Sequence, residues 1–232
     1  MKILGIIPAR GGSKGVPGKN IKLLGGKPLL QYTSDIALKG NLLDKVILSS
    51  DDDDIIEVAK SLSLSVPFKR PNNLAADKSP TLPVIQHALN FFKDKGEEFD
   101  AVCLLQVTSP MRSLQSLNSA LEKFISSNAD SLVSVREVPH EYNPHWTFTL
   151  SDNDNLKIAT GENEIISSRQ DLPKAYHRDG SIYITKTSVI LEGNSLYGNT
   201  IAYAESKEEA FVNIDTLKDW EKAEKIFKSL NL

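Results

Sequence analysis

The sequence predicts an α/β protein with a mainly parallel sheet and helices on both faces. Through the first 140 residues, short apolar runs alternate with segments whose apolar residues recur at helical spacing. The first apolar run leads directly into a glycine-rich loop, which is typical of the first strand of such a sheet. With 232 residues, 40% of them hydrophobic and 25% charged, the chain can form one globular domain spanning 1–232.

The alternation predicts strands and helices in turn. Strands are expected at Ile3–Ile7, Val46–Leu48, Ala101–Val107 and Ser131–Val135. Helices are expected at Leu29–Leu38, Asp53–Leu62, Thr81–Phe92 and Leu114–Phe124. The remainder of the chain predicts strands at Ser181–Thr187 and Val212–Ile214 and a closing helix at Lys218–Leu230. Ligands of parallel sheets bind beyond the carboxyl ends of the strands, so loops 8–20, 49–54 and 106–112 should share one edge.

A different pattern begins after Val138. Alternating Trp146, Phe148 and Leu150, followed by a turn at 152–155, predict a β-hairpin that projects from the sheet. Isolated two-stranded ribbons are marginally stable in water. Residues 139–165 are therefore expected to form an inserted dimerisation segment, the alternative being a hairpin folded back onto its own domain.

The loop after the first strand concentrates positive charge. No acidic residue precedes Asp35, although the whole chain has a net charge of −3. Glycines allow backbone N–H groups to approach a polyanion, and the cations would neutralise it. The spacing matches neither the Walker pattern nor G-x-G-x-x-G. The loop predicts a phosphate site of another kind, and the alternative is a solvated glycine-rich connection.

Three further segments are candidate sites. Arg70 precedes a predicted helix and could place its guanidinium beside a base or phosphate, or simply belong to a turn before an N-cap such as Ser79. Residues 106–112 follow the central strand, which favours ligand binding over helix capping. A polar cluster at 168–180 could recognise an acidic ligand or lie on a solvated surface.

Two acidic segments raise the question of a metal. Asn213 and Asp215 are two apart, so on a strand they would share one face, and their oxygens suit Mg²⁺. An ordinary strand end is the alternative. The four aspartates at 51–54 are more typical of a helix N-terminus than of a metal site.

Composition excludes several classes of protein. No apolar stretch approaches the length of a membrane span, and the opening apolar run is too short for a signal peptide. The single cysteine, Cys103, excludes an intramolecular disulfide and lies in an apolar run typical of a buried strand. We expect a cytoplasmic protein that binds neither membrane nor nucleic acid.

Five segments in order resemble the acylneuraminate cytidylyltransferases, also called CMP-sialic acid synthetases. They are PARGGSKGVPGKN, KRPNNLAADKSPT, LLQVTSPMR, SRQDLPKAYHRDGSIYI and VNIDTLKDWEKAE. The resemblance implies a Rossmann-like nucleotidyltransferase fold, so that 1–232 is a single cytidylyltransferase domain, and a homodimer formed through the inserted segment. It also implies dependence on Mg²⁺ and transfer of CMP from CTP to the anomeric 2-hydroxyl of a nine-carbon 2-keto sugar acid, with release of pyrophosphate. The resemblance further implies a role in cell-surface polysaccharide biosynthesis.

The resemblance also implies roles for individual residues. The nucleotide would be bound by Arg10, Gly11, Gly12, Ser13, Lys14, Lys19, Asn20, Arg70 and Ser79. The sugar acid would be bound by Gln106, Thr108, Ser109, Arg169, Gln170, His177 and Arg178. Asp215 and Asn213 would hold the metal, and Arg10, Lys19 and Asp215 would be catalytic.

Two departures from the family pattern leave alternatives open. Asn213 stands where the family usually has the first aspartate of D-x-D, and 177–180 alters the residues before the usual Asn-Gly. The acceptor could be sialic, legionaminic or pseudaminic acid. The protein could instead be a CTP-binding regulatory module, a uridylyltransferase or a cytidylyltransferase for the eight-carbon acid KDO, although residues 104–112 disfavour KDO.

Overall fold

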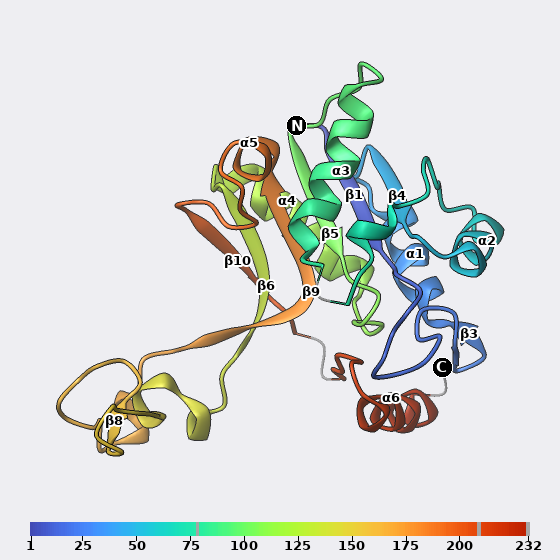
Figure 1. Ribbon diagram of the computed structural model, residues 1–232. Coiled ribbons are helices and arrows are strands. Elements are labelled where there is room, and N and C mark those ends of the chain that lie inside the picture. The colour runs from blue at the N-terminus through green and yellow to red at the C-terminus, as the bar shows by residue number, and fades with distance from the viewer. Residues whose placement is uncertain (78, 208–209, 231–232) are drawn as a thin grey trace.

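A six-stranded sheet in the order β10-β6-β9-β5-β1-β4 forms the centre of the computed structural model, which describes residues 1–77, 79–207 and 210–230 (Figure 1). Its strands are β1 (Ile3–Pro8), β4 (Lys45–Ser49), β5 (Ala101–Leu105), β6 (Ser131–Glu137), β9 (Tyr176–Lys186) and β10 (Ile201–Glu205). β1 pairs in parallel with β4 and β5, and β6 with β10, whereas β9 is antiparallel to both β5 and β6. One strand therefore runs against the others, which confirms a mainly parallel sheet.

Helices cover both faces of this sheet, as predicted. One face packs against α1 (Leu29–Lys39), α2 (Asp53–Ser61) and α4 (Leu114–Ser127), and α6 (Leu217–Ser229) joins the same hydrophobic core through its contacts with Tyr32 and β2. The other packs against α3 (Thr81–Lys93) and α5 (Thr187–Leu191). Alternation along the strands supplies both cores: in β1, Ile3 and Ile7 face the first set of helices, while Leu4 and Ile6 face the second.

The helix starts follow their capping residues. At the start of α2, the Asp52 carboxylate accepts a hydrogen bond from the Ile55 N–H at 3.0 Å, so this acidic run is a helix N-terminus as expected. α3 begins at Thr81, as predicted, and its N-cap is Pro80. The alternative in which Ser79 caps this helix is wrong, because the Ser79 hydroxyl donates to the Asn73 carbonyl.

Two strand predictions need correction. The strand expected at 181–187 begins at Tyr176, because its polar first half pairs with the end of β6 across a bulge near Val135. Residues 212–214 do not form a strand. Val212 and Ile214 are buried as the alternation indicated, but the Ile214 N–H donates to the Thr108 carbonyl rather than to a neighbouring strand. Neither β10 nor α5 was anticipated.

Residues 138–175 form an arm that leaves the sheet between β6 and β9 and projects away from it (Figure 1). The arm carries the expected hairpin, β7 (Phe148–Leu150) with β8 (Leu156–Ile158), and three 3₁₀ turns at His140–Tyr142, Pro144–Trp146 and Arg169–Asp171. Trp146 was wrongly assigned to the hairpin. It lies in the preceding turn, where its indole N–H donates to the Ile166 carbonyl at 2.6 Å.

Near the site, residues 9–22 link β1 to the short ribbon of β2 (Leu23–Leu24) and β3 (Lys27–Pro28), and a 3₁₀ turn at Asn72–Leu74 precedes α3. At Gly15 the backbone of the loop 9–22 lies against the chain before α6. In the described part of the chain, no helix combines the length and the apolar character needed to cross a membrane.

Gly15 offers a test of this packing. A Cβ added at Gly15 would lie 1.9 Å from the Asp215 carbonyl oxygen, whereas one added at Gly12 meets nothing within 4 Å. Gly15→Ala must push the two segments apart, so we expect it to lower the melting temperature by about 3–10 °C, the effect of a typical overpacking strain in a domain of this size. Gly12→Ala is the control and should melt like the wild type. Equal melting of both variants would contradict the close approach.

Candidate functional site

The loops that follow β1, β4 and β5 meet at the carboxyl edge of the sheet, as the parallel topology requires. The Ala9 N–H after β1 donates to the Ser49 carbonyl at 3.0 Å. The Thr108 carbonyl after β5 accepts the Ile214 N–H at 2.9 Å, which brings the chain before α6 to the same edge. Segments from both ends of the sequence thus border one site.

A pocket of about 200 Å³ opens between these loops. Eight residues predicted for the site line it: Arg10, Ser13, Lys19, Asn20, Arg70, Ser79, Gln106 and Thr108. Apolar side chains of Leu74, Val84 and Val107 complete the wall. The pocket combines cationic, amide and hydroxyl groups with an apolar surface, which suits a charged ligand that carries a flat or hydrophobic part.

Other predicted residues lie outside this pocket. Ser109 is buried beside it and its hydroxyl donates to the Gly180 carbonyl at 3.3 Å. Lys14 is 80% exposed on the loop that also contains Gly11 and Gly12. The residues expected to bind the sugar acid are spread more widely. Arg169 lines a separate hollow of about 420 Å³ in the arm, Gln170 is exposed in the same turn, and His177 and Arg178 are exposed at the start of β9.

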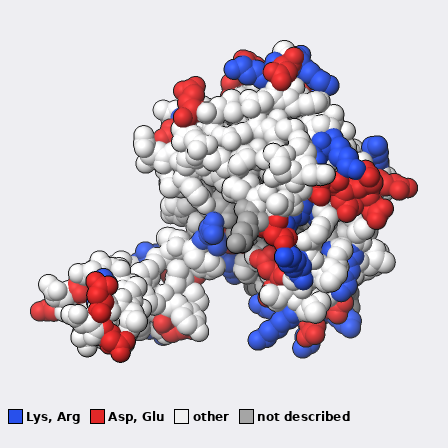
Figure 2. Space-filling view, in the orientation of Figure 1, with Lys and Arg blue, Asp and Glu red and all other residues white. Residues whose placement is uncertain are grey.

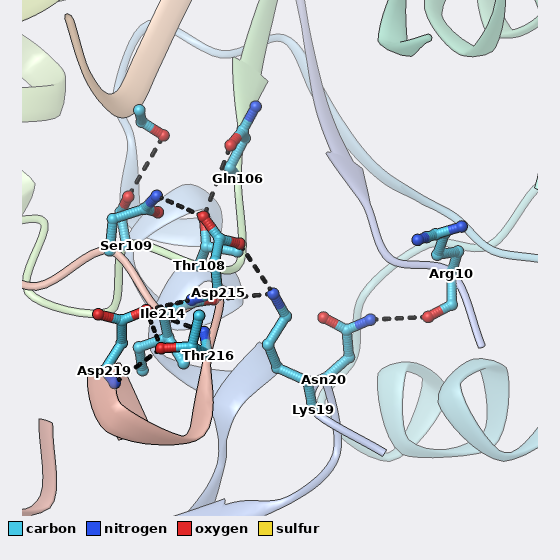
Figure 3. Close-up of polar contacts among 12 residues, drawn as sticks. Arg10, Lys19, Asn20, Gln106, Thr108, Ser109, Ile214, Asp215, Thr216 and Asp219 are labelled. Atoms are coloured by element: carbon cyan, nitrogen blue, oxygen red, sulfur yellow. Dashed lines mark hydrogen bonds and ion pairs between the residues drawn. The ribbon is translucent and has the colours of Figure 1, made fainter. Parts of the chain in front are cut away.

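Lys19 lies at the centre of the polar contacts (Figure 3). Its side chain is 12% exposed, and its ammonium donates to the Ile214 carbonyl at 2.7 Å and to the Asp215 carboxylate at 3.2 Å. Asn20 stabilises the loop from within, since its side-chain amide donates to the Arg10 carbonyl at 2.9 Å. The cation of Lys19 is therefore held at a defined point of the site.

Asn213 and Asp215 lie on the same side of the chain although they are not on a strand. The Asn213 amide N–H donates to the Asp215 carboxylate at 2.8 Å. The buried amide oxygen of Asn213 has no hydrogen-bond partner among the described residues, and it lies 3.6 Å from where a Cβ at Gly180 would be. The Asp215 carboxylate itself is 61% exposed. Asp215 thus offers an accessible carboxylate, and Asn213 an unused oxygen acceptor.

Arg70 is buried against the end of β4. Its guanidinium donates to both the hydroxyl and the carbonyl of Ser49. Burial lowers the pKa of Arg70 to about 10, with the nearby Asp51 opposing that shift and Arg10 adding to it. Arg70 remains cationic at neutral pH and is fixed in place at the pocket wall.

Asp77, to which the sequence motifs assign no role, pairs with two cations of the glycine-rich loop. One of its carboxylate oxygens accepts from the Arg10 guanidinium at 2.9 Å, and the other is paired with the Lys14 ammonium. The hydrogen bond from Lys14 is the largest cause that lowers the pKa of Asp77, and Arg10 adds to it. The signal in the sequence was an acidic residue in the same segment as Arg70, which was a candidate site residue.

Arg112 and Asp179 organise the far side of the site from buried positions. The Arg112 guanidinium donates to the Ser181 and Gln106 carbonyls, which ties the loop after β5 to β9. The Asp179 carboxylate accepts from the Ser134 hydroxyl and from the Ser181 N–H. A buried arginine and a buried aspartate here support the backbone, so the family-like segments contain structural as well as ligand-facing groups.

Charge at this end of the molecule is mixed. Figure 2 shows acidic and basic side chains intermingled at the lower right, where the loops around β3 and α6 lie in Figure 1.

Cys103 takes no part in the site. It is fully buried in β5, and burial raises the pKa of its thiol to about 12, which leaves it protonated and unreactive at neutral pH.

Comparisons with known proteins show the family to which the chain belongs. A family profile for cytidylyltransferases matches residues 4–231. The chain is 36% identical over 228 residues to a pseudaminic acid cytidylyltransferase of Campylobacter jejuni, covering 98% of this chain and 97% of that one. It is 34% identical over 238 residues to a CMP-N,N'-diacetyllegionaminic acid synthase of Legionella pneumophila, with the same coverage of each.

The fold has relatives among solved structures. A CMP:2-keto-3-deoxy-manno-octonic acid synthetase complexed with CTP superposes with a TM-score of 0.74 at 17% identity, covering 99% of this chain and 100% of that one. This likeness concerns the fold, and the sequence matches carry the family. A profile that matches almost the full length, together with relatives above 30% identity over the same span, shows that the chain belongs to the cytidylyltransferase family of nucleotidyltransferases.

Proposed function

We propose that the protein transfers CMP from CTP to the anomeric 2-hydroxyl of a nine-carbon 2-keto sugar acid and releases pyrophosphate. The observation that carries this proposal is the pocket at the carboxyl edge of the sheet, where Arg10, Lys19 and Arg70 converge with Gln106. Two full-length relatives, named for pseudaminic and diacetyllegionaminic acids, support a nonulosonic acid as the acceptor. The reaction would take place in the cytoplasm.

In the proposed reaction the sugar hydroxyl attacks the α-phosphorus of CTP in line, and pyrophosphate leaves. Such a transfer depends on positioning and on neutralisation of charge. The cations Arg10, Lys14 and Lys19 bind the triphosphate, and Ser13 with the Gly11 and Gly12 backbone lines it. Asn20, Arg70 and Ser79 select cytidine. Lys19 is the residue best fixed to stabilise the leaving group, because two oxygens of the chain before α6 hold its ammonium.

The side-chain oxygens of Asn213 and Asp215 fit Mg²⁺ as part of a coordination shell that the substrate phosphates would complete. The Asp215 carboxylate is accessible, and the unused Asn213 oxygen can turn beside it if the amide gives up its bond to Asp215. Mg²⁺ is commonly bound by one or two carboxylates plus substrate phosphates. When bound, the ion would neutralise phosphate charge and acidify the attacking hydroxyl. Among the described residues, no group of three or more His, Cys, Asp and Glu side chains could hold a metal ion.

The acceptor would lie next to Gln106, Thr108 and Ser109. We propose that Arg169, Gln170, His177 and Arg178 bind the sugar acid in a homodimer, because Arg169 is carried on the arm, away from the pocket of its own chain. The arm exposes apolar side chains at Phe148, Leu150 and Leu156. Exposed leucines that face each other across a two-stranded ribbon favour burial against a second copy.

A screen of pyrophosphate release tests the function. Four nucleoside triphosphates are combined with N-acetylneuraminic, legionaminic, pseudaminic and KDO acids in the presence of Mg²⁺. We expect release only with CTP and a nine-carbon acid. Release with KDO as the only productive acid would favour a cytidylyltransferase for KDO. Release with UTP as the only productive nucleotide would favour a uridylyltransferase. Binding of CTP without turnover on any acid would favour a regulatory module.

Lys19→Ala tests the nucleotide site. We expect turnover with CTP to fall on the order of a hundredfold or more, the usual effect of removing one preorganised charged contact to a transition state. Lys22→Ala is a matched control from the same loop, since the Lys22 ammonium stacks over the Trp220 ring instead. Steady-state kinetics on folded, purified variants measure both. Normal activity in Lys19→Ala would remove this loop from the phosphate site.

The altered metal pair predicts a specific magnesium dependence. Asp215→Ala should be inactive at every Mg²⁺ concentration, whereas Asn213→Asp should lower the concentration that gives half-maximal rate, because Mg²⁺ prefers charged oxygen ligands. Magnesium titrations of the wild type and both variants measure this. Near-normal activity of Asp215→Ala would mean that the metal is held elsewhere, with Asp51 and its neighbours as the next candidates.

The arm predicts the oligomeric state. Light scattering at micromolar concentration should give the mass of a dimer for the wild type and of a monomer for Leu156→Asp, which puts a charge into the proposed interface. Leu156 is 68% exposed and directly opposite Leu150. Leu23→Asp, at a leucine 60% exposed on β2, is the control and should stay dimeric. A monomeric wild type would rule out the interface.

A further inference from the structure

Asp77 pairs with two of the three cations that the proposed function assigns to the triphosphate. Its carboxylate joins Arg10 and Lys14 with one oxygen each, and the Arg10 guanidinium also reaches the Ala75 carbonyl at 3.5 Å. Arg10 lines the pocket, as do Ala76 and Ser79 on either side of Asp77. A carboxylate carried by the pocket wall is thus the ionic partner of the phosphate-binding loop.

Binding of a triphosphate changes what these cations meet. Arg10 and Lys14 would each have to turn part of their donors from the carboxylate to phosphate oxygens. A carboxylate left within the same contact would then lie beside a polyanion of like charge, which is unfavourable at short range. The side chain of Asp77 is 39% exposed, so it has solvent to move into when it is displaced.

We propose that Asp77 is an affinity-determining residue of the nucleotide site, which competes with the triphosphate for Arg10 and Lys14. The inference rests on the proposed function, because it takes the loop 9–22 to be the triphosphate site. The competition acts on the phosphates alone. It weakens binding of CTP and of the pyrophosphate product, and it leaves recognition of the cytidine moiety unchanged.

The opposite effect is also physically reasonable and must be separated from competition. A carboxylate that holds two cations in place could preorganise them, in which case its removal weakens binding. The structure favours competition because Lys14 is 80% exposed and Arg10 has a second partner on the same loop as Asp77. The ion pairs with Asp77 therefore hold Arg10 and Lys14 toward the wall of the pocket, and the N–H groups in these pairs are not available to phosphate.

The experiment measures dissociation constants by calorimetry for CTP, inorganic tripolyphosphate and cytidine. We expect Asp77→Asn to bind CTP and tripolyphosphate on the order of tenfold more tightly than the wild type, the scale expected when two partly exposed ion pairs no longer compete. Cytidine binding should not change. Glu97→Gln is the matched control, because Glu97 likewise bridges two cations, Lys2 and Lys45, but lies before β5 at the opposite end of the sheet. It should bind all three probes like the wild type.

The outcomes separate this inference from the proposed function. Unchanged or weaker binding of both phosphate probes by folded Asp77→Asn overturns the competition, while wild-type binding of CTP leaves the function intact. If Glu97→Gln also bound the phosphate probes more tightly, the change in net charge alone would explain the result, and the proposed competition would be overturned. A wild type that binds neither CTP nor tripolyphosphate defeats the proposed function itself. Asp77→Ser, which is smaller and also neutral, provides a second variant if Asp77→Asn does not fold, and the same tightening is expected.

Discussion

The contact of the Lys19 ammonium with the chain at 214–215 is the interaction on which the site depends. It joins a loop near the start of the sequence to the segment that precedes the last helix. Gly15 allows this approach, since any side chain there would strike the Asp215 carbonyl. The Thr108 carbonyl completes the junction by accepting the Ile214 N–H. Three segments far apart in sequence are thereby brought to one edge of the sheet, where the first loop and the loop after β5 line the pocket together with residues between Arg70 and Val84.

Much of this arrangement could be predicted because local patterns and topology agreed. The apolar run Ile3–Ile7 and its glycine-rich loop indicated a strand that ends at a ligand edge, and the parallel sheet placed the loop after β5 beside it. Asp52 showed the same agreement, because a carboxylate before an amphipathic run is a helix cap. Eight predicted residues line one pocket for that reason.

The errors arose where long-range pairing outweighed local sequence. The first half of β9 contains His177, Arg178 and Gly180, which do not alternate like a strand, yet residues 176–178 pair with the end of β6. Residues 212–214 alternate like a strand, but the Ile214 N–H donates to the Thr108 carbonyl instead of to a paired strand. Trp146 looked like part of the hairpin because a turn of three residues leaves no mark on an alternating pattern. Arg169 lay on an arm whose direction depends on where β6 and β9 separate, which periodicity does not encode.

Every cation proposed to bind the triphosphate already has a carboxylate partner, and this pairing explains how an acidic chain keeps a basic pocket. Arg10 and Lys14 share Asp77, and Lys19 has Asp215. In the proposed function, binding of the nucleotide is therefore an exchange of partners and not the filling of an uncompensated positive site. The exchange at Lys19 has a further consequence: an ammonium that turns to phosphate frees an oxygen of Asp215, the carboxylate proposed to hold Mg²⁺. Nucleotide and metal would then bind in concert, because each relieves the pairing that obstructs the other.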